Sequence, residues 1–179
     1  MEQCEVMEQG AVMIQGSEVV AEAREWLGTR WHHQAATKGI GTDCMGLVRG
    51  VSARLGLMPP DIMQTPAALP FAGYGRTPFE GRLEAACSIF FSPISQVHAQ
   101  LGDVVLLSFE VLKFETLKVD AAAHHVGILG DYPAGGFSLI HAYMPSRKVI
   151  ESLLDEVWLS RVVSYWRIPG VCRTQRRKA

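Results

Sequence analysis

The stretch that decides the fold is Gly41-Thr42-Asp43-Cys44-Met45-Gly46-Leu47-Val48. Loop-forming residues precede it and apolar residues at helical spacing follow it, so it predicts a helix that begins at Asp43 or Cys44. Thr42 or Asp43 can cap the free N–H groups of the first turn. These N–H groups and the helix dipole favour a thiolate at Cys44, which makes it a candidate nucleophile. Gly46 leaves room for a substrate beside the sulfur. The alternative, which this stretch alone leaves open, is a small buried apolar residue.

Two histidines in the second half of the chain are spaced to act as a base and its orienting partner. A strong turn signal at residues 131–136 separates two predicted strands. His125 and His141 are equidistant from its centre at residue 133, so an antiparallel hairpin would bring them opposite each other on one face. One ring can then take the thiol proton of Cys44, while the second ring fixes the tautomer of the first. His124 should point to the other face, away from this pair.

The order of the predicted elements is that of an α+β domain. Helices come first and strands follow, whereas a doubly wound parallel sheet would alternate them. Turn and capping signals predict helices at residues 17–27, 43–55, 77–90 and 154–161, and strands at residues 103–109, 124–129, 137–143, 148–151 and 163–168.

Length and composition fit one globular domain with its own core. The chain has 179 residues, of which 48% are hydrophobic and 20% charged. We expect a flexible leader at residues 1–16, a single catalytic domain at residues 17–170, and a basic tail at residues 171–179. The net charge of −1 argues against nucleic acid as a partner.

Cysteine spacing and hydropathy indicate the cellular compartment in which the protein is made. The four cysteines form no C-x-x-C pair, which argues against a zinc knuckle or a thioredoxin-like site and fits a reducing compartment during synthesis. The first residues lack a basic segment followed by an apolar one, and no apolar run is long enough to span a bilayer. We therefore expect synthesis in the cytoplasm without a signal peptide, and no membrane insertion.

Several motifs along the chain point to one family. They are Leu27-Gly28-Thr29, Trp31-His32-His33-Gln34, the stretch from Gly41 to Gly50, Leu101-Gly102-Asp103-Val104, His125-Val126-Gly127-Ile128, Ile140-His141-Ala142, Asp155-Glu156-Val157-Trp158 and Arg167-Ile168-Pro169-Gly170. Together they resemble the NlpC-type cell-wall cysteine peptidases, and most closely the branch associated with bacteriophage tails and gene-transfer particles.

The resemblance implies a fold and an activity. The fold is papain-like, with the nucleophile helix packed on an antiparallel sheet that carries the histidines. The activity is hydrolysis of peptidoglycan stem peptides, typically between D-γ-glutamate and a diamino acid, without a metal or other cofactor. Cys44 would be the nucleophile, His125 the base and His141 the orienting residue. The resemblance also implies action in the periplasm or cell wall after delivery by a phage-like particle or a lysis system, with tail or particle proteins as partners.

The resemblance assigns substrate contacts to the residues around the nucleophile. They are Trp31, Asp43 and Met45, and His33 is added because it closely precedes Cys44. Many family members have tyrosine in place of Trp31 and serine in place of Met45. Indole has no phenolic hydroxyl and methionine donates no hydrogen bond, so these substrate contacts must differ from those of the family.

Three other functions stay open. A zinc hydrolase could use Cys44 with several histidines, although no pair of them has the i, i+4 spacing of a metallopeptidase. A different acyl-transfer hydrolase, such as an amidase or a thioesterase, would share the same catalytic residues. A tail component that only binds wall peptides would need neither Cys44 nor His125.

Overall fold

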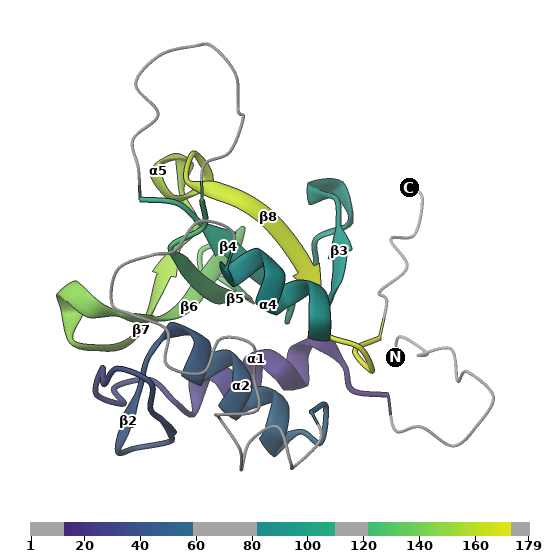
Figure 1. The fold of residues 1–179 in the computed structure, drawn as a ribbon. Coiled ribbons are helices and arrows are strands. Elements are labelled where there is room, and N and C mark those ends of the chain that lie inside the picture. Colours follow the sequence, from purple (N-terminus) through teal and green to yellow (C-terminus); the bar gives the residue numbers. More distant parts are fainter. Residues whose placement is uncertain (1–12, 59–81, 110–121, 173–179) are drawn as a thin grey trace.

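A computed structural model describes residues 13–58, 82–109 and 122–172 (Figure 1). The α+β order expected from the sequence is confirmed. The elements are α1 (Gly16–Arg24), β1 (Ala36–Thr37), β2 (Gly41–Thr42), α2 (Cys44–Arg54), α4 (Arg82–Phe90), β3 (Ser92–Ile94), β4 (Val104–Leu107), β5 (His125–Asp131), β6 (Phe137–Tyr143), β7 (Lys148–Leu153), α5 (Glu156–Leu159) and β8 (Val162–Arg167). None of the helices in these ranges is long and apolar enough to cross a membrane.

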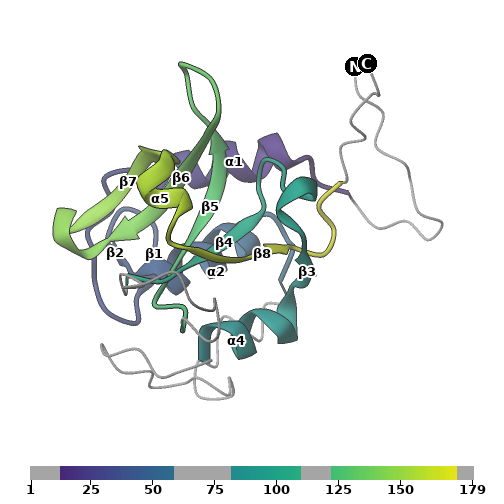
Figure 2. The same cartoon turned by 90° about the horizontal axis from the view of Figure 1, so that it is seen from above.

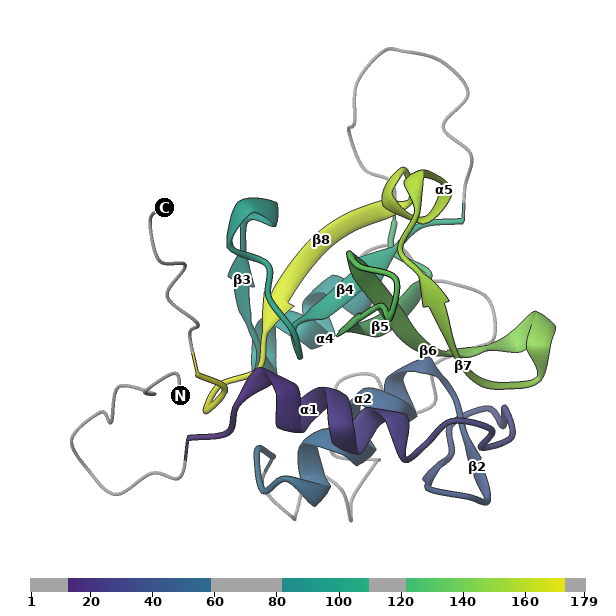
Figure 3. The ribbon, with the colours of Figure 1, turned by 180° about the vertical axis from the view of Figure 1, so that it is seen from behind.

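One antiparallel sheet organises the domain. Its six strands lie in the order β3-β8-β4-β5-β6-β7, and the view from above shows how it curves (Figure 2). Helices α1 and α2 lie side by side against one face (Figure 3). Alternate side chains of β4 point to opposite faces of the sheet, as the two-residue period of a strand requires. Val104 and Leu106 join the core under the helices, whereas Val105 and Leu107 join a second apolar cluster on the opposite face with Trp158 of α5.

The first helix starts earlier than the sequence predicted. The sequence predicted a start at residue 17, whereas the N-cap is Gln15, because Glu18 lies three residues after Gln15 and accepts its backbone N–H at 2.7 Å. Ile14, which we had placed in a loose leader, forms a parallel bridge with Val171. Residues 14–16 therefore belong to the folded domain.

Several expectations lie outside the described residues. They concern the first twelve residues, the start of the helix predicted at residues 77–90, and the tail after residue 172.

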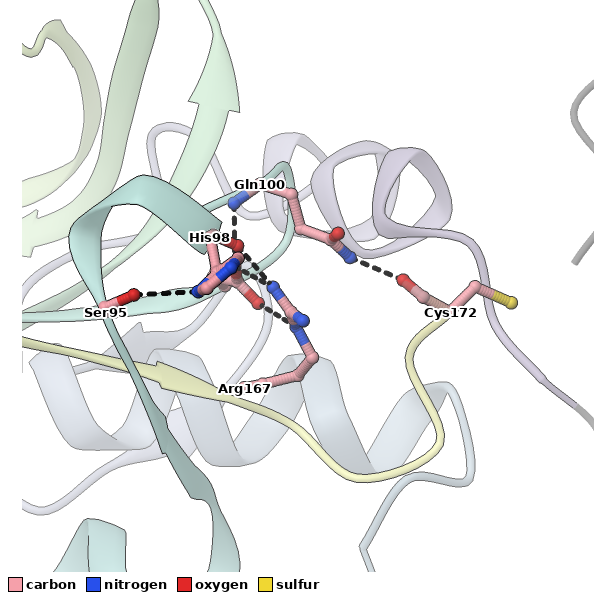
Figure 4. Close-up of polar contacts among 6 residues, drawn as sticks. Ser95, His98, Gln100, Arg167 and Cys172 are labelled. Atoms are coloured by element: carbon pink, nitrogen blue, oxygen red, sulfur yellow. Dashed lines mark hydrogen bonds and ion pairs between the residues drawn. The ribbon is translucent and has the colours of Figure 1, made fainter. Parts of the chain in front are cut away.

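A buried ion pair joins two of the family-like motifs that lie far from Cys44. Asp103 is 0% exposed, and Arg167 donates to both of its carboxylate oxygens, at 2.9 and 2.8 Å. Arg167 also donates to the His98 carbonyl at 2.8 Å, and Gln100 bridges from Asp103 to the Cys172 carbonyl (Figure 4). Burial raises the pKa of the Asp103 carboxyl, and the neighbouring guanidinium opposes this. The two motifs thus anchor the last strand to the rest of the sheet.

Candidate active site

Asp43 is the N-cap residue of α2, the helix that begins at Cys44. Its Oδ1 accepts the Gly46 N–H at 2.8 Å, which satisfies a free donor of the first turn of α2. Its Oδ2 accepts the Gln34 N–H at 2.6 Å, which ties the preceding loop to the helix. Thr42, the other capping candidate, donates instead to the Asp43 carbonyl at 3.1 Å. Cys44 is therefore held in the first turn of α2, as the sequence predicted.

Gly46 makes room for backbone and not for substrate, contrary to our interpretation of the sequence. A Cβ added at Gly46 would overlap the Ala35 carbonyl oxygen and come within 2.8 Å of Thr42 Oγ1. That same carbonyl accepts the Asp43 N–H at 3.2 Å. Glycine is needed because the loop before α2 passes directly over its first turn.

Cys44 is a protonated thiol at neutral pH. Burial raises its pKa to about 12, and the negative charge of Asp43 acts in the same direction. The N–H groups of Cys44, Met45 and Val126 lower the pKa, as expected for a sulfur at a helix start. They do not outweigh burial, so the helix start by itself does not produce a thiolate at Cys44. Cys44 needs a base to become a nucleophile.

The structure brings the two predicted histidines together. Nε2 of His125 on β5 lies 2.8 Å from Nδ1 of His141 on β6. Both residues are buried, with exposed fractions of 5% for His125 and 0% for His141. The hairpin pairs Asp131 with Phe137, so its centre is residue 134 and not residue 133 as predicted. This shift moves the residue directly opposite each histidine by two positions along the strand, so both histidines stay on the same face of the sheet. The rings therefore meet diagonally instead of directly across the ladder.

Both rings are neutral at neutral pH. Burial lowers the pKa of His141 to about 4. Burial, and secondly the proximity of His141, lower the pKa of His125 well below its ordinary value. Because Nε2 of His125 is turned to His141, Nδ1 is the nitrogen that can face a thiol. The Cys44 sulfur is near the backbone N–H of Val126, the residue after His125. The site combines a neutral thiol with a neutral imidazole pair.

Aromatic rings surround the histidine pair, and the sequence did not reveal this arrangement. Tyr143 stacks on His141 with ring centroids 5.1 Å apart, and Trp158 meets the same ring edge-on at 5.0 Å. Phe109 lies 5.3 Å from the ring of His125. Tyr143 could have been found from the strand period, because it follows His141 by two residues. Trp158 comes from α5, and no local sequence signal connects it to the site.

The four predicted substrate contacts fall into two groups. Trp31 and His33 are partly exposed and stack with centroids 6.2 Å apart, on the loop before α2. Met45 is 5% exposed and belongs to the core, and Asp43 is 2% exposed with its carboxylate bonded to backbone. Met45 and Asp43 therefore present little surface, and a substrate contact at either one stays a prediction.

Two further cysteines and His124 have surroundings of their own. Cys87 is 0% exposed, and burial raises its pKa to about 12. Cys172 is disulfide-bonded, which the scattered spacing of the cysteines did not predict. His124 is partly exposed, with Nδ1 3.3 Å from Ser108 Oγ. Within residues 13–58, 82–109 and 122–172, no three His, Cys, Asp or Glu side chains are grouped as a metal ion would require.

Solved structures share this fold. An NLP/P60 family protein similar to lipoprotein, from Staphylococcus aureus, superposes with a TM-score of 0.54 and 17% identity, over 90% of this chain and 45% of that one. An NlpC/P60 family protein from Bacillus cereus gives 0.57 and 16%, over 88% and 41%. NlpC2 from Trichomonas vaginalis gives 0.55 and 16%, over 94% and 50%.

The chain spans half or less of the length of these three proteins. No protein-family model and no curated protein matches the sequence. The fold is the papain-like α+β fold of NlpC/P60 proteins, with helices packed on an antiparallel sheet.

Proposed function

We propose that this chain is an NlpC/P60-type cysteine peptidase that hydrolyses the peptide stems of bacterial peptidoglycan. The observation that carries the proposal is the buried pair of His125 and His141, joined at 2.8 Å beside a cysteine in the first turn of a helix. The shared fold and the family-like motifs around Cys44 support it. The bond we propose is the amide between D-γ-glutamate and the diamino acid.

The proposed chemistry begins with a proton transfer. Nδ1 of His125 takes the Cys44 proton as the sulfur attacks the carbonyl carbon, so the neutral thiol becomes a nucleophile only when substrate is present. The Cys44 N–H at the free end of α2 stabilises the oxyanion. His125 then returns the proton to the leaving amine, and a water activated by the same ring hydrolyses the thioester. His141 accepts the Nε2–H of His125 throughout and stabilises its cationic form.

Trp31 and His33 are the proposed contacts for the stem peptide, because their stacked rings are partly exposed on the loop that Asp43 ties to the nucleophile helix. We expect Trp31→Tyr to change the preference among stem peptides by about tenfold or less, with little change in melting temperature. Melting curves and kinetics on two synthetic stem peptides measure this. A drop of several degrees with unchanged preference would assign Trp31 to the core instead.

Mass spectrometry of muropeptides tests the activity. Peptidoglycan incubated with the protein should yield new stem fragments that end at D-glutamate, and the Cys44→Ala variant should yield none. Release of whole stems from the sugar chain would indicate an amidase instead. Binding to peptidoglycan without any new product, by both proteins, would indicate a non-catalytic wall-binding component. A chelator should leave the products unchanged, whereas loss of activity on chelation would favour a zinc hydrolase.

We also propose that the protein acts in the periplasm or cell wall, delivered by a phage-like particle or a lysis system. This rests on the sequence resemblance to the branch associated with tails and gene-transfer particles. Proteomics of purified particles from cells that produce them should detect the chain together with tail proteins. Its detection only in the soluble cytoplasm of such cells would contradict the proposal.

A further inference from the structure

We infer that Ser152 is a positioning residue that accepts the Nε2–H of His141 and so stabilises the tautomer that leaves Nδ1 of His125 free to act as a base. Oγ of Ser152 lies 3.3 Å from Nε2 of His141, whose Nδ1 lies 2.8 Å from Nε2 of His125. Both ring nitrogens of the buried His141 are thus engaged, one by each neighbour. The inference rests on the proposed function in one respect, namely that His125 is the base.

The sheet itself builds this row of three side chains on β5, β6 and β7. In the β6–β7 ladder His141 pairs with Ile150 and Ser152 pairs with Leu139. Ser152 is therefore the diagonal neighbour of His141 on the same face, two positions along β7 from the direct partner. His125 and His141 stand in the same diagonal relation across β5 and β6. Because the positions come from strand register, the row needs no loop to hold it.

Only one arrangement of ring protons lets His125 act as a base at Nδ1. A neutral imidazole carries a single N–H, so the proton of His125 must be on Nε2, where it donates to Nδ1 of His141. His141 must then carry its own proton on Nε2, where Ser152 Oγ accepts it. If His141 were protonated on Nδ1, His125 would have to accept at Nε2 and carry its proton on Nδ1. That tautomer cannot take a proton from the thiol.

Ser152 matters because His141 is closed to solvent. The residue is 0% exposed, so an Nε2–H without the hydroxyl would be a buried donor with no acceptor. Burial keeps the ring neutral by lowering its pKa to about 4, so a tautomer choice exists at neutral pH. Tyr143 and Trp158 contact the ring of His141 through their own rings, which fixes its plane. The Arg161 guanidinium lies 5.4 Å from the Trp158 ring, and its positive charge disfavours a positive charge on His141.

A matched pair of substitutions isolates the hydroxyl. Threonine and valine have nearly the same shape, and both are good strand residues, so Ser152→Thr keeps the acceptor and Ser152→Val replaces it with a methyl group. The first measurement is nitrogen-15 NMR of labelled histidine in the whole protein, which distinguishes Nδ1–H from Nε2–H rings. We expect His141 to be Nε2–H in wild type and in Ser152→Thr, and to populate Nδ1–H in Ser152→Val.

The second measurement is the rate at which iodoacetamide modifies Cys44, which reports the base without any substrate. We expect Ser152→Val to slow it at neutral pH by at least about tenfold, because the wrong tautomer disables the base, and Ser152→Thr to stay near wild type. An Nδ1–H ring at His141 in the wild-type protein overturns the inference, whether or not the valine variant folds. Unchanged tautomer and rate in Ser152→Val overturn it as well.

The outcomes separate this inference from the proposed function. If the tautomer and the alkylation rate change as expected but peptidoglycan is not cleaved by wild type, Ser152 has the inferred role and the proposed function is wrong. If wild type and Ser152→Val cleave peptidoglycan equally with the same tautomer, the proposed function stands and the role of Ser152 is refuted.

Discussion

Mild acid should destabilise this protein through its buried histidine pair, and removal of His141 should relieve part of that effect. His141 has a pKa of about 4 in the folded protein, against 6.5 for an ordinary histidine. Between these pH values the His141 ring is protonated in the unfolded chain and neutral in the folded chain. Unfolding therefore becomes more favourable as the pH falls from 6.5 towards 4. Above pH 6.5 the contribution is constant. The lowered pKa of His125 acts in the same direction.

The gap between 6.5 and about 4 corresponds to about 3 kcal/mol of unfolding free energy, of which about 2 kcal/mol is lost by pH 5. Urea unfolding at about pH 7.5 and about pH 5 measures it. In His141→Asn, whose amide does not titrate, the stability difference between the two pH values should shrink by about 2 kcal/mol relative to wild type. The control His32→Asn, which removes an exposed ring, should keep the wild-type difference. An equal loss in His141→Asn and wild type would refute the argument that His141 is held neutral by burial.

Three further predictions concern the thiols and the buried ion pair. Iodoacetamide at neutral pH should modify Cys44 well before Cys87, which is 0% exposed. The His125→Ala variant should lose this difference in modification rate. Peptide mapping that found Cys87 modified first would contradict the prediction. One residual rate of stem-peptide hydrolysis is expected for Cys44→Ala, His125→Ala and the double variant, because nucleophile and base work as a unit. A double variant whose rate loss is the product of the two single losses would show that the two residues act independently. Asp103→Ala should lower the unfolding free energy by about 3–5 kcal/mol in urea titrations, since it leaves Arg167 buried without its counter-charge; a loss below about 1 kcal/mol would mean that solvent reaches the guanidinium.

Local patterns were enough to predict the main elements. The strand Phe137–Tyr143 has the predicted bounds, and the helix of the nucleophile starts at Cys44 as expected. Both predictions rest on signals within a few residues, namely apolar periodicity, turn residues and a cap. The strand Ser92–Ile94 was missed because it has three residues, contains a proline, and forms only by pairing with β8 far along the chain.

The contact between the two histidines was predictable for a specific reason. A hairpin keeps sequence-distant residues at a separation set by its turn, so the shared face of His125 and His141 followed from spacing. The error of one residue in the hairpin centre changed the contact from direct to diagonal and left the face unchanged, because the side-chain period is two.

The sequence by itself determined which residues could do chemistry: a cysteine at a helix start, and two histidines on one face of a hairpin. Only the tertiary structure decided their protonation states and their supporting partners. Burial by segments distant in sequence raises the pKa of the Cys44 thiol and lowers the pKa of the His141 ring, and no local pattern predicts that burial. Likewise Ser152 and Trp158 reach His141 from β7 and α5, since strand register and helix packing, not sequence spacing, set those contacts.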